Sequence, residues 1–386
     1  MIDVIVVGCG FAGAIVARKL AEEQNKQVLI LEKRAHIGGN MYETDDTHGV
    51  SVHLYGPHIF HTDNEKIFSH LKKYSDWIKY EHEVLGKIDG QMVPIPFNFI
   101  SIERLFVKEK SDYIKRRLLE NFPNKKKISI LDLINSNDDE IKKFGDFVYN
   151  KVFVNYTVKQ WGIPAEKIDK SVINRVPVVL GYDNRYFQDE FQYMPANGFT
   201  KIFENILNHP NIHVELNCDA TDRICIDTNN NKVYFDGVLW DKPIIYTGAI
   251  DELLKYKFGA LPYRSLDLVF ERHDVTSYQN ASVVNYPNEE EFTRITEFKK
   301  LTKQIIEGRT TILKEYPIQY EISSSKNNIP YYPIIDNANI NLYNQYKECI
   351  NNLKNIYLCG RLAEYKYYNM DAVIDRALTL TECIEV

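Results

Sequence analysis

The glycine-rich loop GCGFAG, which follows the first apolar segment, constrains the fold of this chain more than any other feature. Before it, residues 2–7 (IDVIVV) have the apolar, β-branched character of a short buried strand. After it, residues 14–23 (AIVARKLAEE) carry apolar side chains at helical spacing, with charges on the other face. Residues 27–32 (QVLILE) then resemble a second buried strand, so the sequence predicts a βαβ unit with a parallel sheet.

The spacing of the glycines in this loop predicts dinucleotide binding. Gly8 allows a tight turn, Gly10 lets a pyrophosphate approach the backbone, and Gly13 lets the helix pack closely on the strand. The pyrophosphate then lies at the helix N-terminus, where unpaired N–H groups favour negative charge. Glu32 ends the second strand and is placed to accept hydrogen bonds from an adenosine ribose.

Length and composition narrow the class of protein. A chain of 386 residues suits two or three packed domains, and 44% hydrophobic with 26% charged residues is typical of a globular protein. A net charge of −6 argues against a nucleic-acid-binding protein, which would show a basic face. A phosphorylated small ligand remains compatible with this charge.

The sequence also predicts the compartment. The acid at Asp3 and the early glycines do not fit a signal peptide, and no window is apolar over the roughly 18 residues of a membrane span. The six cysteines form no CxxC pair and no metal-ligand spacing. We therefore expect a cytoplasmic protein with reduced thiols, no membrane insertion and no metal site.

The remaining pattern predicts an α/β protein in several parts. Residues 99–162 are helical and charged, whereas residues 173–194 and 261–323 alternate as in antiparallel strands with one solvated face. A strand at 355–360 and a helix at 371–384 return to the first domain. We predict a discontinuous Rossmann-like FAD-binding domain (1–82, 195–250 and 340–386), a helical insertion domain (98–172) and an antiparallel β-sheet substrate domain (83–97, 173–194 and 251–339).

The choice of FAD as the dinucleotide depends on two further features. Glu32 is followed by a glycine pair, Gly38 and Gly39, and this spacing resembles FAD-binding oxidases and their relatives more than NAD dehydrogenases. The helix at 371–384 can direct its N-terminal dipole at a flavin ring, where a reduced flavin carries negative charge. A plain surface helix is the alternative.

Several longer segments carry a specific resemblance. They are EKRAHIGGN, YGPHIFHT, YTVKQWG, FGALPYRSL, FTRITEFK, PYYPI and GRLAEYKYYNM. On these segments the chain resembles bacterial UDP-galactopyranose mutases from its first strand to its last helix. The resemblance implies a homodimeric FAD enzyme, active as reduced FADH−, that interconverts the pyranose and furanose forms of UDP-galactose for cell-surface polysaccharide synthesis. It implies a covalent adduct between flavin N5 and the sugar, with UDP leaving and returning and no net redox change.

The same resemblance assigns substrate-binding residues. Trp161 is expected to stack on the uracil, with Tyr156 and Thr157 along the uridine, although a Trp here can also be a core aromatic. Arg175 and Arg294 match the two arginines that hold the diphosphate, a task suited to a planar guanidinium. Further matching positions are His82, Tyr186, Asn285, Tyr332 and Tyr367. For Lys159 we favour a solvated lysine, or one paired with an acid.

Cofactor-binding and catalytic positions follow from the same family. We expect His61, with Arg175 and Arg294, to act in catalysis, and His58 to lie in a loop on the flavin face; structural histidines, or a metal site with His53, are the alternatives. The chain has Asn369 where most bacterial members have Asp, and Asp371 follows nearby. The expected cofactor-binding positions are Gly8, Gly10, Ala12, Gly13, Glu32, Lys33, Gly39, Asn40, His58, Ile59, Arg361, Met370, Asp371, Ala372 and Val373.

Three other functions stay open from the sequence. A small change near the sugar would make the chain a mutase for UDP-N-acetylgalactose. The dinucleotide fold also suits a flavin amine oxidase or desaturase, and a sugar-nucleotide binding protein without catalysis is a third alternative.

Overall fold

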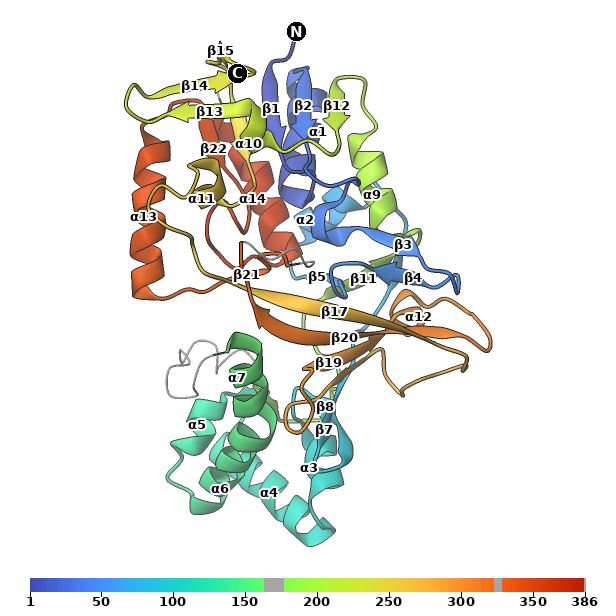
Figure 1. The fold of residues 1–386 in the computed structure, drawn as a ribbon. Helices are drawn as coiled ribbons and strands as arrows, with labels where there is room; N and C mark the ends of the chain where they lie inside the picture. The colour runs from blue at the N-terminus through green and yellow to red at the C-terminus, as the bar shows by residue number, and fades with distance from the viewer. Residues whose placement is uncertain (163–176, 323–327, 385–386) are drawn as a thin grey trace.

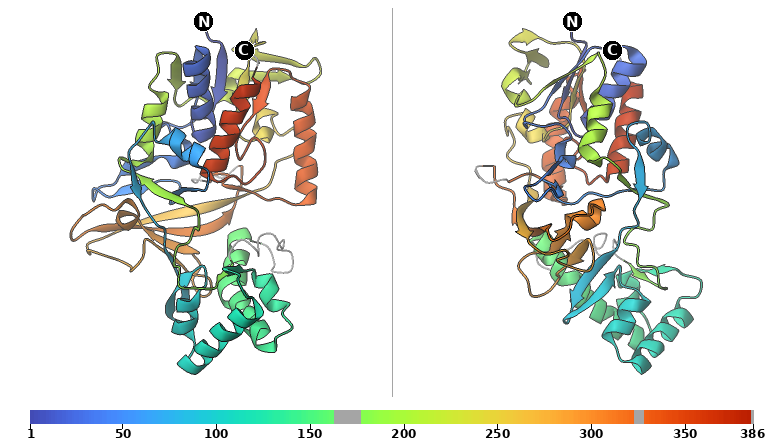
Figure 2. Two further views of the ribbon diagram at one scale, coloured as in Figure 1. Left: turned by 180° about the vertical axis from the view of Figure 1, so that it is seen from behind. Right: turned by 90° about the vertical axis from the view of Figure 1, so that its right-hand side faces the viewer.

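The computed structural model describes residues 1–162, 177–322 and 328–384. These residues form three parts that follow one another from top to bottom in Figure 1. A parallel sheet with helices on both faces lies at the top, a long antiparallel sheet crosses the middle, and a helical unit lies below. The two further views in Figure 2 show the same arrangement, with the crossing sheet between the other two parts.

The parallel sheet confirms the predicted βαβ unit. Its strands lie in the order β12 (Ile212–Glu215), β2 (Val28–Leu31), β1 (Val4–Val7), β16 (Ile244–Tyr246) and β22 (Ile356–Leu358). Both neighbours of β1 run parallel to it, and all four β1 residues are buried. A strand covered on both faces is continuously apolar, as VIVV is. Because β16 and β22 come from far along the chain, this part is discontinuous.

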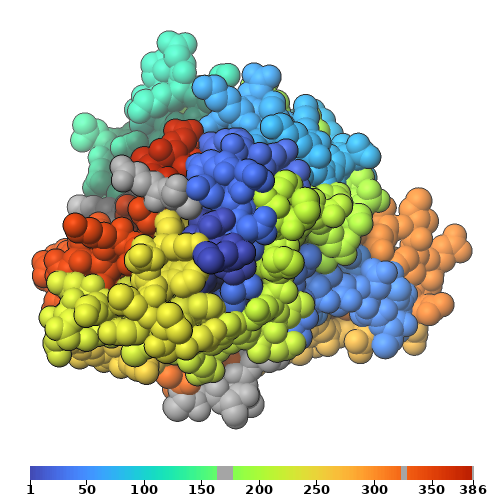
Figure 3. Space-filling model, turned by 90° about the horizontal axis from the view of Figure 1, so that it is seen from above, coloured from blue at the N-terminus to red at the C-terminus, as the bar shows by residue number. Residues whose placement is uncertain are grey.

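Helices cover both faces of this sheet. On one face, α1 (Phe11–Gln24), α9 (Gly198–Leu207) and α14 (Met370–Cys383) pack around Ile15, Leu20, Phe203 and Ile374. On the other face lie α11 (Ile250–Leu253) and α13 (Asn337–Asn351). From above, the N-terminal residues lie beside the yellow segment before residue 250, so distant segments share one face (Figure 3).

A seven-stranded sheet crosses the middle of the molecule. Its strands lie in the order β21 (Tyr332–Pro333), β17 (Tyr263–His273), β20 (Thr310–Gln319), β19 (Arg294–Glu297), β18 (Val283–Asn285), β7 (Val84–Ile88) and β8 (Gln91–Ile95). Every pair is antiparallel except β18 with β7. The alternating pattern at residues 261–323 therefore predicted the correct kind of strand.

The placement of residues 173–194 in this sheet was wrong for the strands that the structure describes. Here β10 (Val178–Val179) pairs with β9 (Lys127–Ile128) of the helical unit. Farther on, β11 (Phe191–Pro195) lies between β5 (Phe60–Thr62) and β6 (Trp77–Lys79). Alternation shows that a strand has one solvated face, but it does not specify the partner strand.

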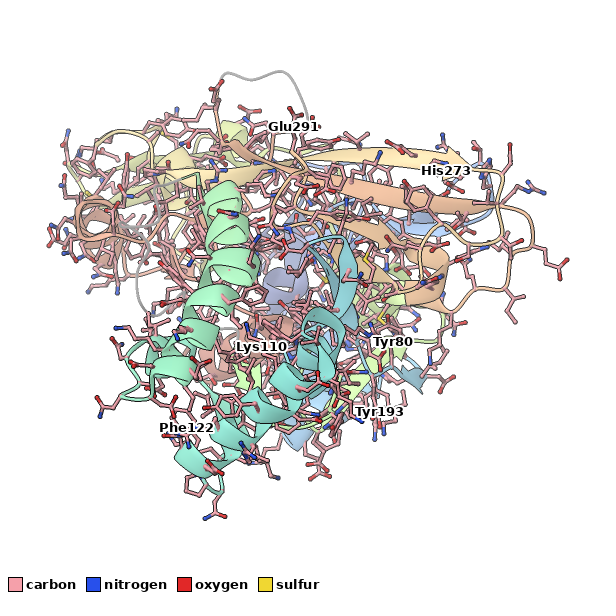
Figure 4. All side chains as sticks on the ribbon, turned by 90° about the horizontal axis from the view of Figure 1, so that it is seen from below. Tyr80, Lys110, Phe122, Tyr193, His273 and Glu291 are labelled. Carbon is pink, nitrogen blue, oxygen red and sulfur yellow. The ribbon has the colours of Figure 1, made fainter. Side chains whose placement is uncertain are left out.

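The helical unit has its own apolar core and contains the stretch that ends at Trp161. Its helices are α3 (Phe99–Leu105), α4 (Lys108–Asn121), α5 (Ile130–Ile134) and α6 (Asp139–Val148), then a π-helical segment η2 (Tyr149–Val154) and α7 (Asn155–Trp161). Of the residues labelled in Figure 4, Lys110 lies in the first turn of α4 and Phe122 directly follows its last residue. A π-helical turn shifts the phase of a helix. Here η2 leads directly into α7.

Shorter elements complete the fold. They are η1 (Gly39–Met41), β3 (Glu43–Asp45), β4 (Ser51–His53), α2 (Glu65–Leu71), α10 (Ala220–Arg223), β13 (Ile224–Asp227), β14 (Lys232–Phe235), β15 (Val238–Leu239) and α12 (Phe298–Thr302). Within the described ranges, no helix is both long enough and apolar enough to cross a membrane.

One buried acid in α11 gives a prediction about stability. Asp251 is 2% exposed; its Oδ2 accepts the Leu261 N–H at 2.8 Å, and its Oδ1 has no partner among the described residues. Burial raises the pKa of Asp251 from its ordinary value of 3.8 to about 6. The folded state therefore binds this proton more tightly than the unfolded state does.

We expect Asp251 to reduce the free energy of unfolding by about 2 kcal/mol as the pH rises from 4 to 7, because the folded state holds the proton of this acid to a higher pH than the unfolded state does. Asp251→Asn keeps the acceptor for Leu261 and removes the titration. The difference in unfolding free energy between variant and wild type, measured by denaturant titration, should therefore grow from pH 4 to pH 7. A difference that stays constant over this range would contradict the assignment.

Candidate active site

A cavity of about 280 Å³ lies between α7 and the seven-stranded sheet. Its polar lining comes from α7, from the strands β18, β19 and β21, and from the loops that precede β11 and α14. Eight of the predicted substrate-binding residues line it together: Tyr156, Thr157, Trp161, Tyr186, Asn285, Arg294, Tyr332 and Tyr367. The rest of the lining is largely apolar and includes Ile95, Phe97, Val152 and Phe153. The cavity thus has a polar side on the sheet and an apolar end in the helical unit.

Arg294 supplies positive charge to this cavity. It lies opposite Glu315 in the β19–β20 register, and its Nε donates a hydrogen bond to the Glu315 carboxylate, which is only 1% exposed. Burial opposes the charge, but Glu315 outweighs it, so the pKa of Arg294 is raised and the guanidinium stays charged. The Glu315 carboxylate thus holds the planar guanidinium group of Arg294, and Arg294 lines the cavity. Arg175, the other predicted arginine, lies outside the described residues.

Tyrosine side chains add neutral donors around Arg294. Burial raises the pKa of Tyr156, of Tyr186 and of Tyr332, the last to about 12, so their phenols stay protonated at neutral pH. The Tyr332 ring stacks on Tyr367 with centroids 6.0 Å apart, and it lies 6.4 Å from the Trp161 ring. A protonated phenol can bind a phosphate oxygen without adding a second cation.

A second groove, of about 270 Å³, lies at the ends of β1 and β2 and the N-termini of α1 and α14. The carboxyl end of a parallel sheet, beside helix N-termini, is where such folds bind dinucleotides. The predicted cofactor-binding residues that line it are Gly8, Gly10, Ala12, Glu32, Lys33, Gly39, Asn40, His58, Arg361, Met370 and Val373.

The three loop glycines have different roles in this groove. Gly8 has φ +94°, and a Cβ there would lie 2.2 Å from Thr247 Oγ1. A Cβ on Gly13 would lie 2.0 Å from the Gly8 carbonyl oxygen, so this glycine allows helix and strand to pack closely. Gly10 differs, because the nearest atom to its Cβ position is the Gly39 Cα at 3.8 Å. The space above Gly10 is therefore open for a pyrophosphate.

Glu32 and Arg34 shape the other end of the groove. Glu32 is 5% exposed; its two carboxylate oxygens accept the N–H groups of Cys9 at 2.8 Å and of Arg34 at 2.9 Å. Each oxygen keeps a lone pair for a ribose hydroxyl. Arg34 also lines the groove and donates from Nη2 to Asn40 Oδ1 at 2.9 Å, while its buried Nη1 has no partner among the described residues. Sequence reasoning missed Arg34, although it stands inside the quoted EKRAHIGGN segment.

An arginine connects the groove to the cavity. The Arg361 guanidinium lies 4.9 Å from the Tyr367 ring centroid and 5.6 Å from that of Tyr332. It also donates to the main-chain oxygens of Tyr331, at 3.1 Å, and Tyr368, at 2.6 Å. Because Arg361 lines the groove and both tyrosines line the cavity, the two sites are neighbours.

His58 lies at this junction as well. Its ring lines the groove, and its backbone N–H donates to His53 Nδ1 at 3.1 Å. Burial, the neighbouring His53 and the charges of Arg361 and Arg294 hold the pKa of His58 well below its usual value. The His58 ring is therefore uncharged at neutral pH, and it adds no positive charge to that of Arg361 and Arg294.

Two predicted histidines lie outside both linings. His61 Nδ1 lies 2.9 Å from Asp189 Oδ2, and its ring stacks on Phe187 at 3.6 Å. His82 is 3% exposed and packs against the Tyr186 ring from behind, with centroids 5.8 Å apart. Burial lowers the pKa of His82 to about 3, so it is neutral. The structure thus places His82 as a support for Tyr186 instead of in the cavity wall.

Four predicted cofactor residues are also absent from the groove lining: Gly13, Ile59, Asp371 and Ala372. Ile59 belongs to the apolar core. Asp371 accepts the Thr62 hydroxyl at 2.8 Å, which joins α14 to β5, and its other oxygen accepts the Ala372 N–H. Asn369 is the N-cap of α14, lines the groove and makes no side-chain capping bond.

Two residues near the cavity, Lys159 and Arg264, make contacts that the sequence analysis did not predict. The Lys159 ammonium is half-buried and contacts main-chain oxygens, so it is not a solvated lysine, and it forms no ion pair with an acid within residues 1–162, 177–322 and 328–384. Arg264 is 6% exposed and also contacts main-chain oxygens, those of residues 159 and 160. Neither contact has a sequence signal, because each depends on strands far along the chain.

Comparison with families of known proteins gives two matches. The family model of UDP-galactopyranose mutase matches residues 151–367, which include α7, the seven-stranded sheet from β17 onward and Arg361. The family model of an NAD(P)-binding Rossmann-like domain matches residues 6–74, which include the glycine loop and Glu32.

Individual relatives agree with these matches. A UDP-galactopyranose mutase of Mycoplasma pneumoniae is 36% identical over 98% of this chain and 95% of its own length. A dTDP-fucopyranose mutase of Escherichia coli is 35% identical over 100% of this chain and 98% of its own length. Among solved structures, a reduced UDP-galactopyranose mutase shares the fold, with a TM-score of 0.73, 18% identity, and coverage of 99% of this chain and 93% of the other.

Proposed function

This chain belongs to the UDP-galactopyranose mutase family and is an isomerase of that family, and on this premise we propose that it interconverts UDP-galactopyranose and UDP-galactofuranose. The observation that supports the proposal most strongly is that the cavity and the groove are neighbours. A nucleotide-sized cavity with a charged arginine opens beside a dinucleotide groove, and Arg361 with Tyr332 and Tyr367 forms the junction.

The groove fits FAD. It offers an open space above Gly10, the N-terminus of α1 for the pyrophosphate, and the buried Glu32 carboxylate for the ribose. At its other end, Met370 and Val373 bring the N-terminus of α14 to the groove, where a flavin ring would lie. Bound in the reduced form FADH−, the flavin would supply through N5 the nucleophile for the anomeric carbon, with no net redox change.

The protein's own side chains bind the nucleotide and hold the sugar at the junction. Trp161 offers a face for the uracil, and Tyr156, Thr157 and Asn285 offer polar groups along the uridine. Arg294 and the protonated tyrosines stabilise the diphosphate charge that grows as the bond to the sugar breaks. Holding the released UDP beside the sugar keeps its return effectively unimolecular. We expect Arg175 to contribute a second guanidinium.

The proposal predicts a turnover that depends on reduction. We expect the purified protein to be yellow, and to convert UDP-galactofuranose to UDP-galactopyranose only after treatment with dithionite, because the oxidised flavin lacks the nucleophile. Chromatography of the nucleotide sugars measures the conversion. Equal turnover with oxidised flavin would contradict the flavin role. Hydrogen peroxide formed with an amine substrate would favour the amine-oxidase alternative instead.

A second candidate substrate comes from the dTDP-fucopyranose mutase, which is as similar to this chain as the UDP-sugar enzymes are. The apolar end of the cavity, with Ile95, Val152 and Phe153, is compatible with the extra methyl group of thymine. Parallel assays with the UDP-galactose, UDP-N-acetylgalactose and dTDP-fucose pairs would decide among them by kcat/KM. A cytoplasmic homodimer is also part of the proposal, on the family resemblance.

A further inference from the structure

We propose that Lys159 is a positioning residue that holds the base-binding helix α7 at a set distance from the arginine-bearing hairpin, and so controls the affinity for the UDP part of the substrate. The inference rests on the proposed UDP-sugar cavity. It concerns a side chain outside the cavity lining, whose effect on substrate would act entirely through the backbone of its neighbours.

The contacts that the Lys159 side chain makes in the described part of the chain go to one loop. Its Nζ donates to the main-chain oxygens of Tyr286 at 2.5 Å, Glu290 at 2.8 Å and Phe292 at 3.3 Å. An ammonium group has three N–H donors, so these contacts use its full capacity. Burial lowers the pKa of Lys159, although nearby Glu290 favours the charge. Charge-assisted bonds of this kind are stronger than neutral ones, and here they hold the shape of a loop.

That loop joins the two strands that present Asn285 and Arg294. These two residues are register partners at the loop end of the β18–β19 hairpin, and the Tyr286 N–H donates to the Thr293 oxygen at 2.8 Å just beyond them. The loop includes Glu291, which is labelled in Figure 4. Lys159 therefore fixes the loop directly next to the two predicted substrate residues.

The Glu290 carboxylate does not serve as the partner of Lys159. It pairs instead with Lys87 at 2.6 Å, which leaves the ammonium to the main chain. A bond to three carbonyl oxygens depends on the path of the backbone, whereas an ion pair depends only on the presence of an acid. The Lys159 contact therefore specifies one arrangement of α7 against the hairpin.

Arg264 ties the C-terminal end of α7 to the same sheet. From β17 it donates through Nε to the Gln160 oxygen at 3.0 Å and through Nη2 to the Lys159 oxygen at 3.3 Å. These carbonyls belong to the last turn of α7, where a cation is favoured by the helix dipole. The next residue after the helix, Gly162, has φ +65°, and a Cβ there would lie 2.7 Å from Arg264 Nη1. The helix is thus anchored at its end by Arg264 and on its side by Lys159.

Both anchors act on the residues that would contact the nucleotide. Tyr156, Thr157 and Trp161 stand on α7, while Asn285 and Arg294 stand on the hairpin. Without the ammonium, α7 keeps its own hydrogen bonds and the 3.0 Å bond from Asn155 to Asn288 of the loop, but it loses its three charge-assisted bonds to that loop. The base-binding and phosphate-binding groups would then no longer be held at one separation, and binding of UDP would weaken.

The test is Lys159→Met, which removes the ammonium and keeps much of the chain length. The matched control is Lys151→Met. Lys151 lies in η2, directly before α7, and its side chain forms a solvent-exposed ion pair with Asp89 at 2.8 Å. We expect Lys159→Met to raise the Kd for UDP, measured by calorimetry on the oxidised protein, and the KM at least about tenfold, with kcat within about threefold of wild type. Flavin content should equal that of wild type, and Lys159→Arg should recover part of the affinity.

Wild-type affinity for UDP in Lys159→Met, or an equal loss in Lys151→Met, would overturn the inference. Loss of flavin together with UDP affinity would also overturn it, because the role would then be general folding. The test is separate from that of the proposed function. A wild-type protein that binds UDP but converts no nucleotide sugar would contradict the mutase proposal and leave the positioning role intact.

Discussion

Arg294→Lys is expected to lower kcat/KM for the nucleotide sugar about 10²- to 10³-fold, the size of effect found when one donor to a developing negative charge is lost. Lysine keeps the positive charge next to Glu315 but loses the planar fork that binds two phosphate oxygens at once. Flavin content should not change, since Arg294 lines the cavity and not the groove. Steady-state kinetics with the reduced enzyme and the visible flavin spectrum measure both quantities.

Replacing Arg294 by lysine instead of alanine avoids a loss of protein stability. Arg294→Ala would leave the buried Glu315 carboxylate without its partner, a change that destabilises proteins by about 3–5 kcal/mol. Loss of activity in that variant would then mix chemistry with unfolding. Arg309→Lys is a matched control, because Arg309 is exposed and directly precedes β20. Near-wild-type kcat/KM in Arg294→Lys, or loss of flavin, would contradict the assigned role.

Gly10→Ala is expected to weaken flavin binding at least about 100-fold, or ~2.7 kcal/mol, while leaving the fold intact. The backbone of Gly10 has φ −83°, which alanine adopts freely, and the nearest atom to its Cβ position, among described residues other than its chain neighbours, is the Gly39 Cα at 3.8 Å. The added methyl group would instead occupy the space reserved for the pyrophosphate. Flavin released on dilution and the melting temperature of the apoprotein are the two measurements.

Substitutions at two other glycines serve as comparisons for Gly10→Ala. Gly8→Ala should destabilise the fold itself, because Gly8 has φ +94° and its Cβ would lie 2.2 Å from Thr247 Oγ1. Gly181→Ala should change neither flavin binding nor stability, since no described residue other than its chain neighbours has an atom within 4 Å of its Cβ position. Full flavin affinity in Gly10→Ala would mean that the pyrophosphate does not lie over the glycine loop.

The sequence predicted well those features that depend on neighbours along the chain. The glycine loop, the strands at 2–7 and 27–32 and the last helix are short-range patterns, and each appears in the structure. The resemblance to a family also selected eight residues that the fold brings into one cavity. It was less informative for His82, which lies behind Tyr186, because a family match identifies a position without its surroundings.

Features that depend on distant partners could not be predicted. The strands within 173–194 were recognised, but their partners were not, since backbone hydrogen bonding is the same for every strand. The contacts of Lys159 and Arg264 were missed for the same reason: each cation binds main-chain oxygens, and any residue can supply a main-chain oxygen. The sequence of the π-helical turn before α7, YNKVFV, also contains no pattern that predicts a π-helix.

The sequence by itself determined the dinucleotide fold of this protein, because the turn and close packing after the first strand require glycine at set positions whatever the rest of the chain does. It also determined which side chains are chemically able to bind a nucleotide. Only the tertiary structure decided where these side chains meet. The cavity joins α7 to a hairpin more than 120 residues away, and that meeting depends on backbone carbonyls, which carry no side-chain signature.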